Sequence, residues 1–430
     1  MKRERGSVKL NKERIASGRW DVIVAGGGFA GVGAAVAAAR RGAAVLLIDR
    51  YNCCGGAAAF DLVNPFMRYW TNEEGARKYL SAGIFSEITS MLEAGGALEG
   101  GQRFGTEYLK LVMNRLLLSA GVDILYDTEI VSAEADDGRV RSVRVSNVSG
   151  ISEFTAGFFI DCTGDANLSA MAGFGYRVGR EPDGLCQPMT LCFRLGGVDR
   201  EKINKAEINR LYSQFRAEGR IKNPRENVLM FDTLERSVIH FNTTRIVRRD
   251  PSDAWEVTEA EIEAREQIDE LVCFLKENFE AFRSAVLISS GLRIGARESR
   301  MIDGLYTLTR DDITSFTKFP DGIAACNYDI DIHSPDGTGT SHWYFPDGCW
   351  YTVPYRCLVP KRSRNLLAAG RCVSCDHDAQ ASLRIMPVCC TLGEAAGTAA
   401  AICLREGTDA AGVDTGLLRR ELKDAGCVVD

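Results

Sequence analysis

The glycine-rich segment AGGGFAG, which contains Gly26, Gly28 and Gly31, constrains the fold of this chain more than any other feature. It follows an apolar run, WDVIVA, and precedes an alanine-rich stretch of helical length and a second apolar run, AAVLLID. This order predicts a βαβ unit. In GxGxxG spacing the first glycine allows a tight turn, the second lets the backbone approach a pyrophosphate, and the third lets helix and strand pack closely. The helix N-terminus then favours the negative charge of the phosphates.

An acidic residue closes the second apolar run of this unit. Asp49 follows the glycines by about 20 residues, the position at which a carboxylate accepts a hydrogen bond from a ribose hydroxyl. The glycines and Asp49 together predict a dinucleotide site, and this much suits NAD as well as FAD.

Length and charge limit the remaining possibilities. A chain of 430 residues suits two domains, or one nucleotide-binding domain with a large insertion. Its formal net charge of -6 disfavours a nucleic-acid partner, because binding phosphate backbones normally needs a basic face. The first residues lack the apolar core of a secretory signal, and no uninterrupted apolar run of about eighteen residues occurs. We therefore expect a cytoplasmic enzyme without a membrane partner.

The apolar pattern divides the chain into a nucleotide-binding domain and an insertion. TEYLKLVMNRLLLSAG has helical spacing, whereas DILYDTEIVSAEA, RVRSVRVSNV and EFTAGFFIDCTG read as strands joined by the turns DDG and SG. A long amphipathic helix follows, with a capping box expected at Thr258 and Glu261 and an apolar face that includes Ile268, Leu271 and Leu275. We predict an α/β fold in which residues 20–174 and 355–430 form a Rossmann-type domain. Residues 175–354 form an inserted α+β substrate domain, and residues 1–19 a basic N-terminal tail.

Three further features favour FAD over NAD. Asp49 and Arg50 are followed by Gly55 and Gly56, DCTGD ends a later strand, and NLLAAGR precedes the last long helix. These segments resemble the flavin-binding elements of the glutathione-reductase-like superfamily. Longer stretches such as GARESRMIDGLYTLTRDD and AAGRCVSCDHDAQASLRIMPVCCTLGEAAGTAAA resemble the bacterial family of FAD-dependent oxidoreductases. The resemblance implies a glutathione-reductase-like FAD domain and redox chemistry, in which hydride passes between a small organic substrate and flavin N5. It fixes neither the substrate nor the direction of the reaction.

The resemblance also assigns cofactor contacts residue by residue. Gly26, Gly28 and Gly31 are expected at the pyrophosphate, Asp49 at the adenosine ribose, and the backbone of Ile130 at the adenine. The remaining expected cofactor contacts are Arg50, Gly55, Gly56, Ala57, Gly164, Asp165, Gly370, Arg371, Met386 and Pro387. Pro387 suits the first turn of a helix, whose N-terminus would stabilise negative charge on the reduced flavin.

His333, His377 and Arg384 are the candidate catalytic residues, because the resemblance implies positions near the flavin for all three. A histidine there can transfer a proton, and an arginine can orient an anionic substrate. A structural ion pair or a buried core histidine is the alternative for each of the three. We interpret Arg297 and Arg300 as structural, and His240 and His342 as incidental.

The cysteine pattern leaves two rival functions open. Cys372 and Cys375 form a CxxC, which would suit a thiol-disulfide reductase, but we expect inert buried thiols. No second pair is suitably spaced for zinc, so we expect no metal site. The second rival is a flavin redox carrier or sensing module without small-molecule turnover. A second GxGxxG is missing, so reducing equivalents are expected from the substrate, a protein donor or a soluble nicotinamide.

Overall fold

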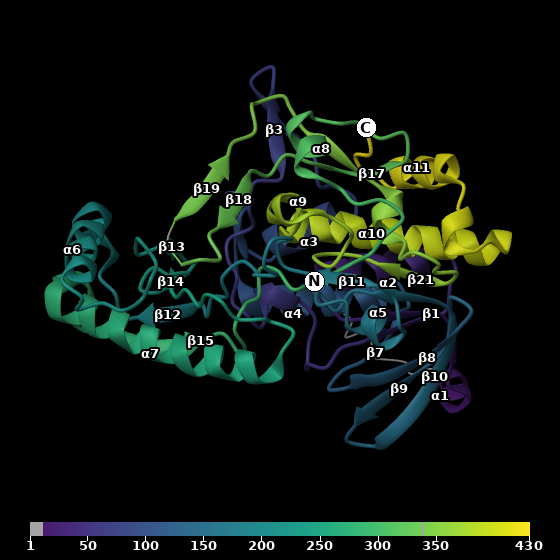
Figure 1. Cartoon of the computed structure of the whole chain (residues 1–430), viewed down its shortest axis with the longest axis horizontal. Coiled ribbons are helices and arrows are strands. Elements are labelled where there is room, and N and C mark those ends of the chain that lie inside the picture. The colour runs from purple at the N-terminus through teal and green to yellow at the C-terminus, as the bar shows by residue number, and fades with distance from the viewer. Residues whose placement is uncertain (1–11, 338) are drawn as a thin grey trace.

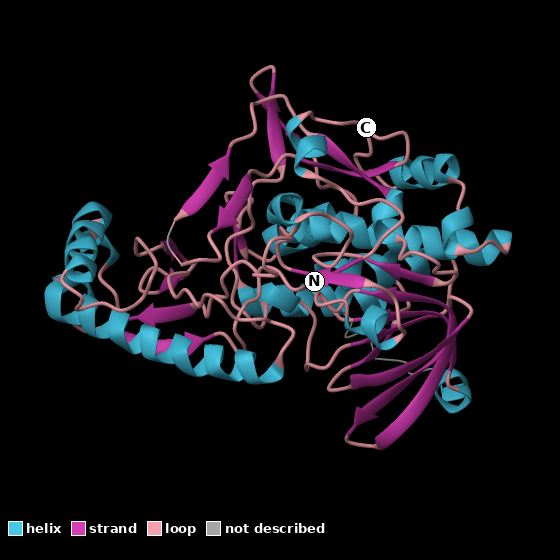
Figure 2. Ribbon diagram, viewed as in Figure 1, coloured by secondary structure: helices cyan, strands magenta, loops and turns pink. Residues whose placement is uncertain are grey.

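The structure is a computed structural model that describes residues 12–337 and 339–430. Two lobes are visible in Figures 1 and 2: a larger one with a mixed sheet between helices, and a smaller one in which two helices cover short strands. Each lobe has its own cluster of buried apolar side chains. The mixed α/β fold with a Rossmann-like sheet confirms the predicted fold class at this level.

The sheet of the larger lobe contains seven strands. Its order is β7 (Asp123–Leu125), β2 (Val45–Ile48), β1 (Arg19–Ala25), β10 (Gly150–Asp161), β9 (Arg139–Asn147) and β8 (Glu129–Asp136), and β21 (Leu366–Ala368) also pairs with β10. The strands β7, β2, β1, β10 and β21 are mutually parallel. Strand β2, VLLI, is buried at every residue, as expected for a parallel strand covered on both faces. The carboxyl ends of these strands therefore meet along one edge, where α/β sheets bind ligands.

Strand β10 belongs to two ladders. Its first half, from Gly150 to Phe154, pairs antiparallel with β9, and its second half runs parallel to β1. The DDG and SG turns join β8, β9 and β10 as predicted, and this meander projects at the lower right of Figure 1. The segment predicted as one strand, DILYDTEIVSAEA, is two strands, because the chain turns at Asp127 with φ 49°.

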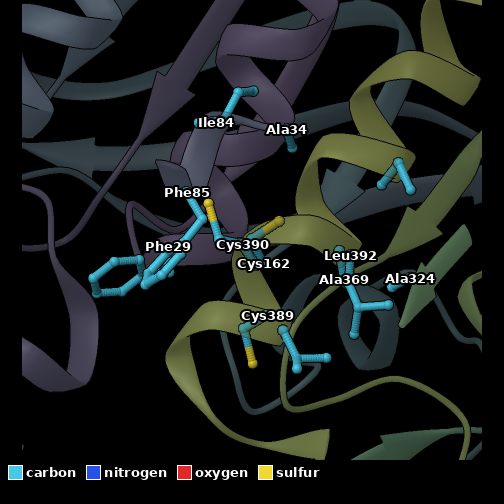
Figure 3. Close-up of a cluster of buried hydrophobic side chains, with 14 of the residues drawn as sticks. Phe29, Ala34, Ile84, Phe85, Cys162, Ala324, Ala369, Cys389, Cys390 and Leu392 are labelled. Atoms are coloured by element: carbon cyan, nitrogen blue, oxygen red, sulfur yellow. The ribbon is translucent and has the colours of Figure 1, made fainter. Parts of the chain in front are cut away.

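Helices α2 (Phe29–Arg40) and α10 (Met386–Glu406) pack on each other through small residues. A Cβ atom on Gly393 would overlap the Ala30 carbonyl oxygen, and one on Gly397 would overlap that of Ala34. Figure 3 shows the cluster around this contact, with Ala34 on α2 and Leu392 on α10. Among the described residues, α10 is the one helix long and apolar enough to cross a membrane. Of its most apolar stretch of 18 residues, 94% is buried inside the protein, so it meets this criterion as a core helix.

The smaller lobe has a four-stranded antiparallel sheet. The strand order is β13 (Met230–Asp232), β14 (Ile239–Phe241), β12 (Phe193–Gly196) and β15 (Val286–Ser290). Helices α6 (Lys205–Ala217) and α7 (Ala254–Asn278) cover it, and the predicted face of α7 is buried. The predicted capping box is wrong. Asp253 caps α7 by accepting hydrogen bonds from Trp255 and Glu256, and Thr258 lies inside the helix, where its hydroxyl donates to the Ala254 carbonyl. Asp253 caps the N-terminus of α7, so the helix begins at Ala254, before Thr258.

The second apolar cluster runs from Met189 to Ile294. Apolar residues of the segment after it, such as Met301, Ile323 and Tyr351, belong to the core of the larger lobe. The apolar core of the smaller lobe therefore uses fewer residues than the predicted insertion, 175–354. The domain boundaries stay a prediction. Of the predicted tail, residues 1–11 lie outside the described residues, and α1 (Lys12–Ser17) follows them.

The remaining α-helices and two-stranded ladders lie around the larger sheet. The helices are α3 (Ile84–Ala94), α4 (Thr106–Ser119), α5 (Asn167–Met171), α8 (Arg310–Thr314), α9 (His377–Leu383) and α11 (Thr415–Asp424). The paired strands are β3 (Trp70–Glu73) with β4 (Ala76–Tyr79), β5 (Leu98–Glu99) with β6 (Arg103–Phe104), β11 (Tyr176–Val178) with β16 (Arg300–Ile302), β17 (Gly322–Cys326) with β20 (Tyr351–Pro354), and β18 (Ile330–His333) with β19 (Thr340–Trp343).

Candidate functional site

A groove follows the carboxyl edge of the parallel strands, and we call it the dinucleotide groove. It lies over the glycine-rich turn between β1 and α2 and reaches the start of α10. Most of the predicted cofactor contacts line it: Gly26, Gly28, Asp49, Arg50, Gly56, Ala57, Ile130, Gly164, Gly370, Arg371 and Met386. Four others do not: Gly31, Gly55, Asp165 and Pro387. Segments far apart in the sequence are therefore brought to one groove.

The three glycines of the turn are needed for different structural reasons. Gly26 has φ 97°, and a Cβ atom there would lie 2.5 Å from the Cys162 carbonyl oxygen. A Cβ atom on Gly31 would overlap the Gly26 carbonyl oxygen, so both residues are glycine for packing inside the protein. Gly28 is different. Its φ of -68° suits any residue, and the nearest atom to an added Cβ, Gly56 Cα, is 3.9 Å away. The absence of a side chain at Gly28 keeps space open in the groove, which fits a bound diphosphate.

Asp49 lies at the end of β2 with its side chain buried. Its Oδ1 accepts a hydrogen bond of 2.8 Å from the Tyr51 backbone, and its Oδ2 accepts one from the Gly27 backbone. Burial raises the pKa of Asp49, although both backbone donors favour the ionised form. The carboxylate is fixed at the groove wall and keeps lone pairs for a ribose hydroxyl.

Asp165 does not line the groove but holds Arg371, which does. The two side chains form an ion pair of 2.5 Å, and Ser299 donates a hydrogen bond of 2.6 Å to the same carboxylate. Burial raises the pKa of Asp165, but Arg371 and Arg293 outweigh it, so that pKa lies below its ordinary value. Asp165 of the DCTGD motif thus holds Arg371 in place at the groove and does not line the groove itself.

A second ion pair lies at the groove, and no sequence pattern indicates it. Arg293, which follows β15, lies 3.0 Å from the buried carboxylate of Asp61, and both line the groove. Burial raises the pKa of Asp61, and the positive charge of Arg293 opposes this shift only in part. Asp61 in turn raises the pKa of Arg293. The two residues are far apart in the sequence and carry no motif, so no sequence signal joins them.

A second cavity of about 590 Å³ opens beside the dinucleotide groove, and we call it the inner cavity. It lies between the sheet of the smaller lobe and the segment that carries β18 and β19. Five residues line both spaces, so the two meet there: Ala57, Asp61, Arg371, Arg384 and Met386. Its apolar lining includes Val63, Met67, Leu229, Phe231, Tyr328 and Ile385. A volume in this range suits a small organic molecule.

His333 lines the inner cavity, but its ring nitrogens are engaged. Arginine can only donate, so the 3.2 Å contact from Arg245 Nη2 makes His333 Nδ1 an acceptor. The proton of the neutral ring is then on Nε2, which lies 3.5 Å from Asp331 Oδ2. Burial, with a contribution from Arg297, holds the pKa of His333 well below its ordinary value. The ring is therefore neutral at neutral pH.

The other histidines lie in three different environments. His377, on the first turn of α9, lines neither cavity and is 2.8 Å from the fully buried carboxylate of Glu298. His342, which no sequence motif surrounds, lines the inner cavity and lies 3.3 Å from Asp331 Oδ1. His240 is buried in the sheet of the smaller lobe, where burial lowers its pKa to about 3.

Cys372 and Cys375 are both fully buried and line neither cavity. Burial raises the pKa of each thiol well above its ordinary value, so neither is a thiolate at neutral pH. Both are free thiols. This environment argues against a thiol-disulfide reductase that uses this pair.

A known protein family matches almost the whole chain. A family model described as FAD dependent oxidoreductase matches residues 21–422. No curated protein sequence matches the chain. Similar solved structures include a geranylgeranyl bacteriochlorophyll reductase-like protein from Thermoplasma acidophilum, at 11% identity and a TM-score of 0.48, covering 94% of this chain and 82% of that one. Another is the p-nitrophenol 4-monooxygenase from Pseudomonas putida, at 10% identity and a TM-score of 0.46, covering 94% and 84%.

Proposed function

The chain belongs to the family of FAD-dependent oxidoreductases, and from that premise we propose that it transfers a hydride between a small organic substrate in the inner cavity and FAD in the dinucleotide groove. The observation that carries the proposal is the junction of the two spaces at Ala57, Arg371, Arg384 and Met386. A substrate in the inner cavity would contact the same residues as the flavin end of the cofactor. When bound, FAD supplies the hydride acceptor or donor.

The residues of the groove would hold the cofactor as follows. The Gly26–Gly28 turn and the N-terminus of α2 would bind the pyrophosphate, Asp49 the ribose, and Ile130 the adenine. Helix α10 begins beside Met386, and Ile385 at its N-cap has no side-chain hydrogen bond to the helix. Its first N–H groups would stabilise negative charge at the flavin end. A glutathione-reductase-like subtype and a cytoplasmic location are part of the proposal.

Arg384 is our candidate for orienting the substrate, because it lines both spaces. For His333 we propose that it positions the Arg245 side chain and does not transfer a proton. Arg245 occupies Nδ1 of the ring, and the ring is neutral. His377 is proposed to stabilise Glu298, because it lines neither space. Both proposals differ from the catalytic roles that the resemblance implies.

The test is to purify the protein, identify the chromophore released on denaturation, and mix the loaded protein anaerobically with a panel of small metabolites. We expect FAD, and loss of the visible flavin band with at least one compound. A protein that binds no flavin under any condition would contradict the proposal. Flavin that exchanges electrons only with a partner protein would favour the redox-carrier function.

A further inference from the structure

The inner cavity contains more positive charge than its own carboxylates balance. Four arginines line it, Arg225, Arg297, Arg371 and Arg384. Arg371 is paired with Asp165. The lining carboxylates Asp61 and Glu226 are likewise paired, with Arg293 and with Arg245 at 3.0 Å. Three arginines therefore remain against one lining carboxylate, Asp331.

Arg225 and Arg297 have only neutral hydrogen-bond partners among the residues that the structure describes. Arg225 Nε donates to Asn227 Oδ1 at 3.2 Å. Arg297 Nη1 donates to the Pro188 carbonyl and to Thr190 Oγ1, and its Nη2 contacts Asn242 Oδ1 at 3.5 Å. Arg384 Nη2 donates to the Asp331 carbonyl at 3.0 Å but is 4.0 Å from the Asp331 carboxylate. Within the described part of the chain, no close ion pair neutralises any of the three.

Two donors of this cluster are buried without an acceptor from residues 12–337 or 339–430. They are Nη1 of Arg225, whose residue is 5% exposed, and Nε of Arg384. A buried guanidinium N–H without a partner is costly, and a ligand oxygen would remove that cost. The three side chains are also close enough to repel one another: burial, then Arg384 and Arg225, lower the pKa of Arg297 to about 9. A negative charge among them would relieve this repulsion.

We propose that the substrate is an organic acid whose carboxylate binds among Arg225, Arg297 and Arg384, with its apolar part against Leu229, Phe231 and Ile385. A planar carboxylate matches the paired N–H donors of guanidinium groups. Because Arg384 also lines the dinucleotide groove, a carboxylate bound there holds the adjoining carbons next to the flavin end of that groove. This inference rests on the proposed function of the inner cavity as the substrate site.

The experiment measures binding to the flavin-loaded protein by calorimetry, separately from turnover. The probes are acetate, benzoate and succinate, each compared with its amide at constant ionic strength, and inorganic phosphate. We expect at least one acid to bind about 10-fold or more tightly than its amide, as charge-assisted hydrogen bonds predict. Arg297→Met should remove that preference while the flavin content stays unchanged, because Arg297 does not line the dinucleotide groove. Arg384→Met should remove the preference as well, measured on the fraction of the variant that holds flavin. Arg384→Met is the second variant because the fewer contacts of Arg384 make misfolding less of a risk.

Arg194→Met is the matched control. Arg194 lies on β12, is partly buried and donates to Thr106, but it lines neither cavity, so its replacement should leave the acid preference intact. A flavin-loaded protein that binds no acid more tightly than its amide would overturn the inference and leave the proposed function standing. Equal affinity for phosphate and for every acid would indicate a general anion site and would also overturn it. A protein without flavin would overturn both.

Discussion

Arg371 and Asp165 form an ion pair of 2.5 Å that joins the loop after β21 to the loop after β10. Arg371 lines both cavities, whereas Asp165 lines neither. Arg371 Nε also donates to the Gly164 carbonyl at 2.9 Å, and Nη1 donates to the Ala296 carbonyl. The arginine is thus held from several sides at the junction of the two spaces.

Replacing Asp165 with asparagine should destabilise the protein and weaken flavin binding. The change leaves Arg371 partly buried without its counter-charge, which costs about 3 kcal/mol when one partner of a buried pair is removed. Because its folded-state pKa is lowered, the Asp165 carboxylate stabilises the fold above its ordinary pKa of 3.8 and loses this effect as pH falls through the folded-state value. Thermal denaturation and flavin titration at neutral pH measure the loss of stability and of flavin affinity.

Ser299→Ala is the control variant. It removes one neutral donor to Asp165 and should cost about 1 kcal/mol. Equal effects of the two variants would contradict the prediction.

Gly28→Val should abolish flavin binding while destabilising the apoprotein by about 1 kcal/mol at most. Its backbone suits any residue, and the nearest atom to an added Cβ is 3.9 Å away, so the cost to the apoprotein is that of a poorer N-cap for α2. Gly31→Ala is the matched variant, since its Cβ overlaps the Gly26 carbonyl oxygen and overpacking costs about 1–3 kcal/mol. Apoprotein melting temperatures and flavin content should therefore separate the two. Normal flavin content in Gly28→Val would show that the cofactor does not approach this turn.

Local sequence predicted the parts of the site that lie within one short segment. The turn at Gly26 and Gly28 is joined directly to the strand and helix that flank it, and Asp49 ends the next strand, so chain connectivity alone fixes their relation. Asp165 was predicted as a cofactor contact because the DCTGD motif, which contains both Gly164 and Asp165, resembles a flavin-binding element. The sequence does not reveal that its side chain turns away to Arg371.

The inner cavity could not be predicted in the same way. Arg225 comes from the smaller lobe, Arg384 from the end of α9, and Asp331 from β18, and only tertiary packing brings them together. Arg297 was interpreted as structural because it flanks Glu298 in sequence. In the structure the two side chains have different partners, since Glu298 contacts His377 and Arg297 lines the cavity.

Cys372→Ala combined with Cys375→Ala should leave flavin content and flavin reduction unchanged. Both thiols are fully buried with a raised pKa, so they are unreactive in the folded protein. Native-state labelling with a thiol reagent tests this. Cys273 is exposed, so Cys273→Ser should remove a fast-reacting thiol, whereas the double variant should remove none. Loss of turnover in the double variant with flavin still bound would restore the disulfide-reductase function.

Glu394→Gln should stabilise the protein at neutral pH and have little effect in acid. Glu394 lies in the middle of α10, where burial raises its pKa to about 6 even though its carboxylate accepts a hydrogen bond of 2.9 Å from Ile84 N. Between the ordinary value of 4.5 and this value the folded state binds more protons than the unfolded state. The free energy of unfolding therefore falls as pH rises through that window, by about 2 kcal/mol for a shift of this size.

The glutamine variant lacks this ionisation, so its advantage in melting temperature should grow from near zero below pH 4.5 to a plateau above pH 6. Glu87→Gln, which removes an exposed carboxylate on the neighbouring α3, controls for the loss of one charge and should change stability by less than about 1 kcal/mol. A difference between Glu394→Gln and the parent protein that is the same at every pH would mean that Glu394 does not change its protonation state in this window. In that case the Ile84 hydrogen bond and the other contacts of α10 would fully compensate the effect of burial on the pKa of Glu394.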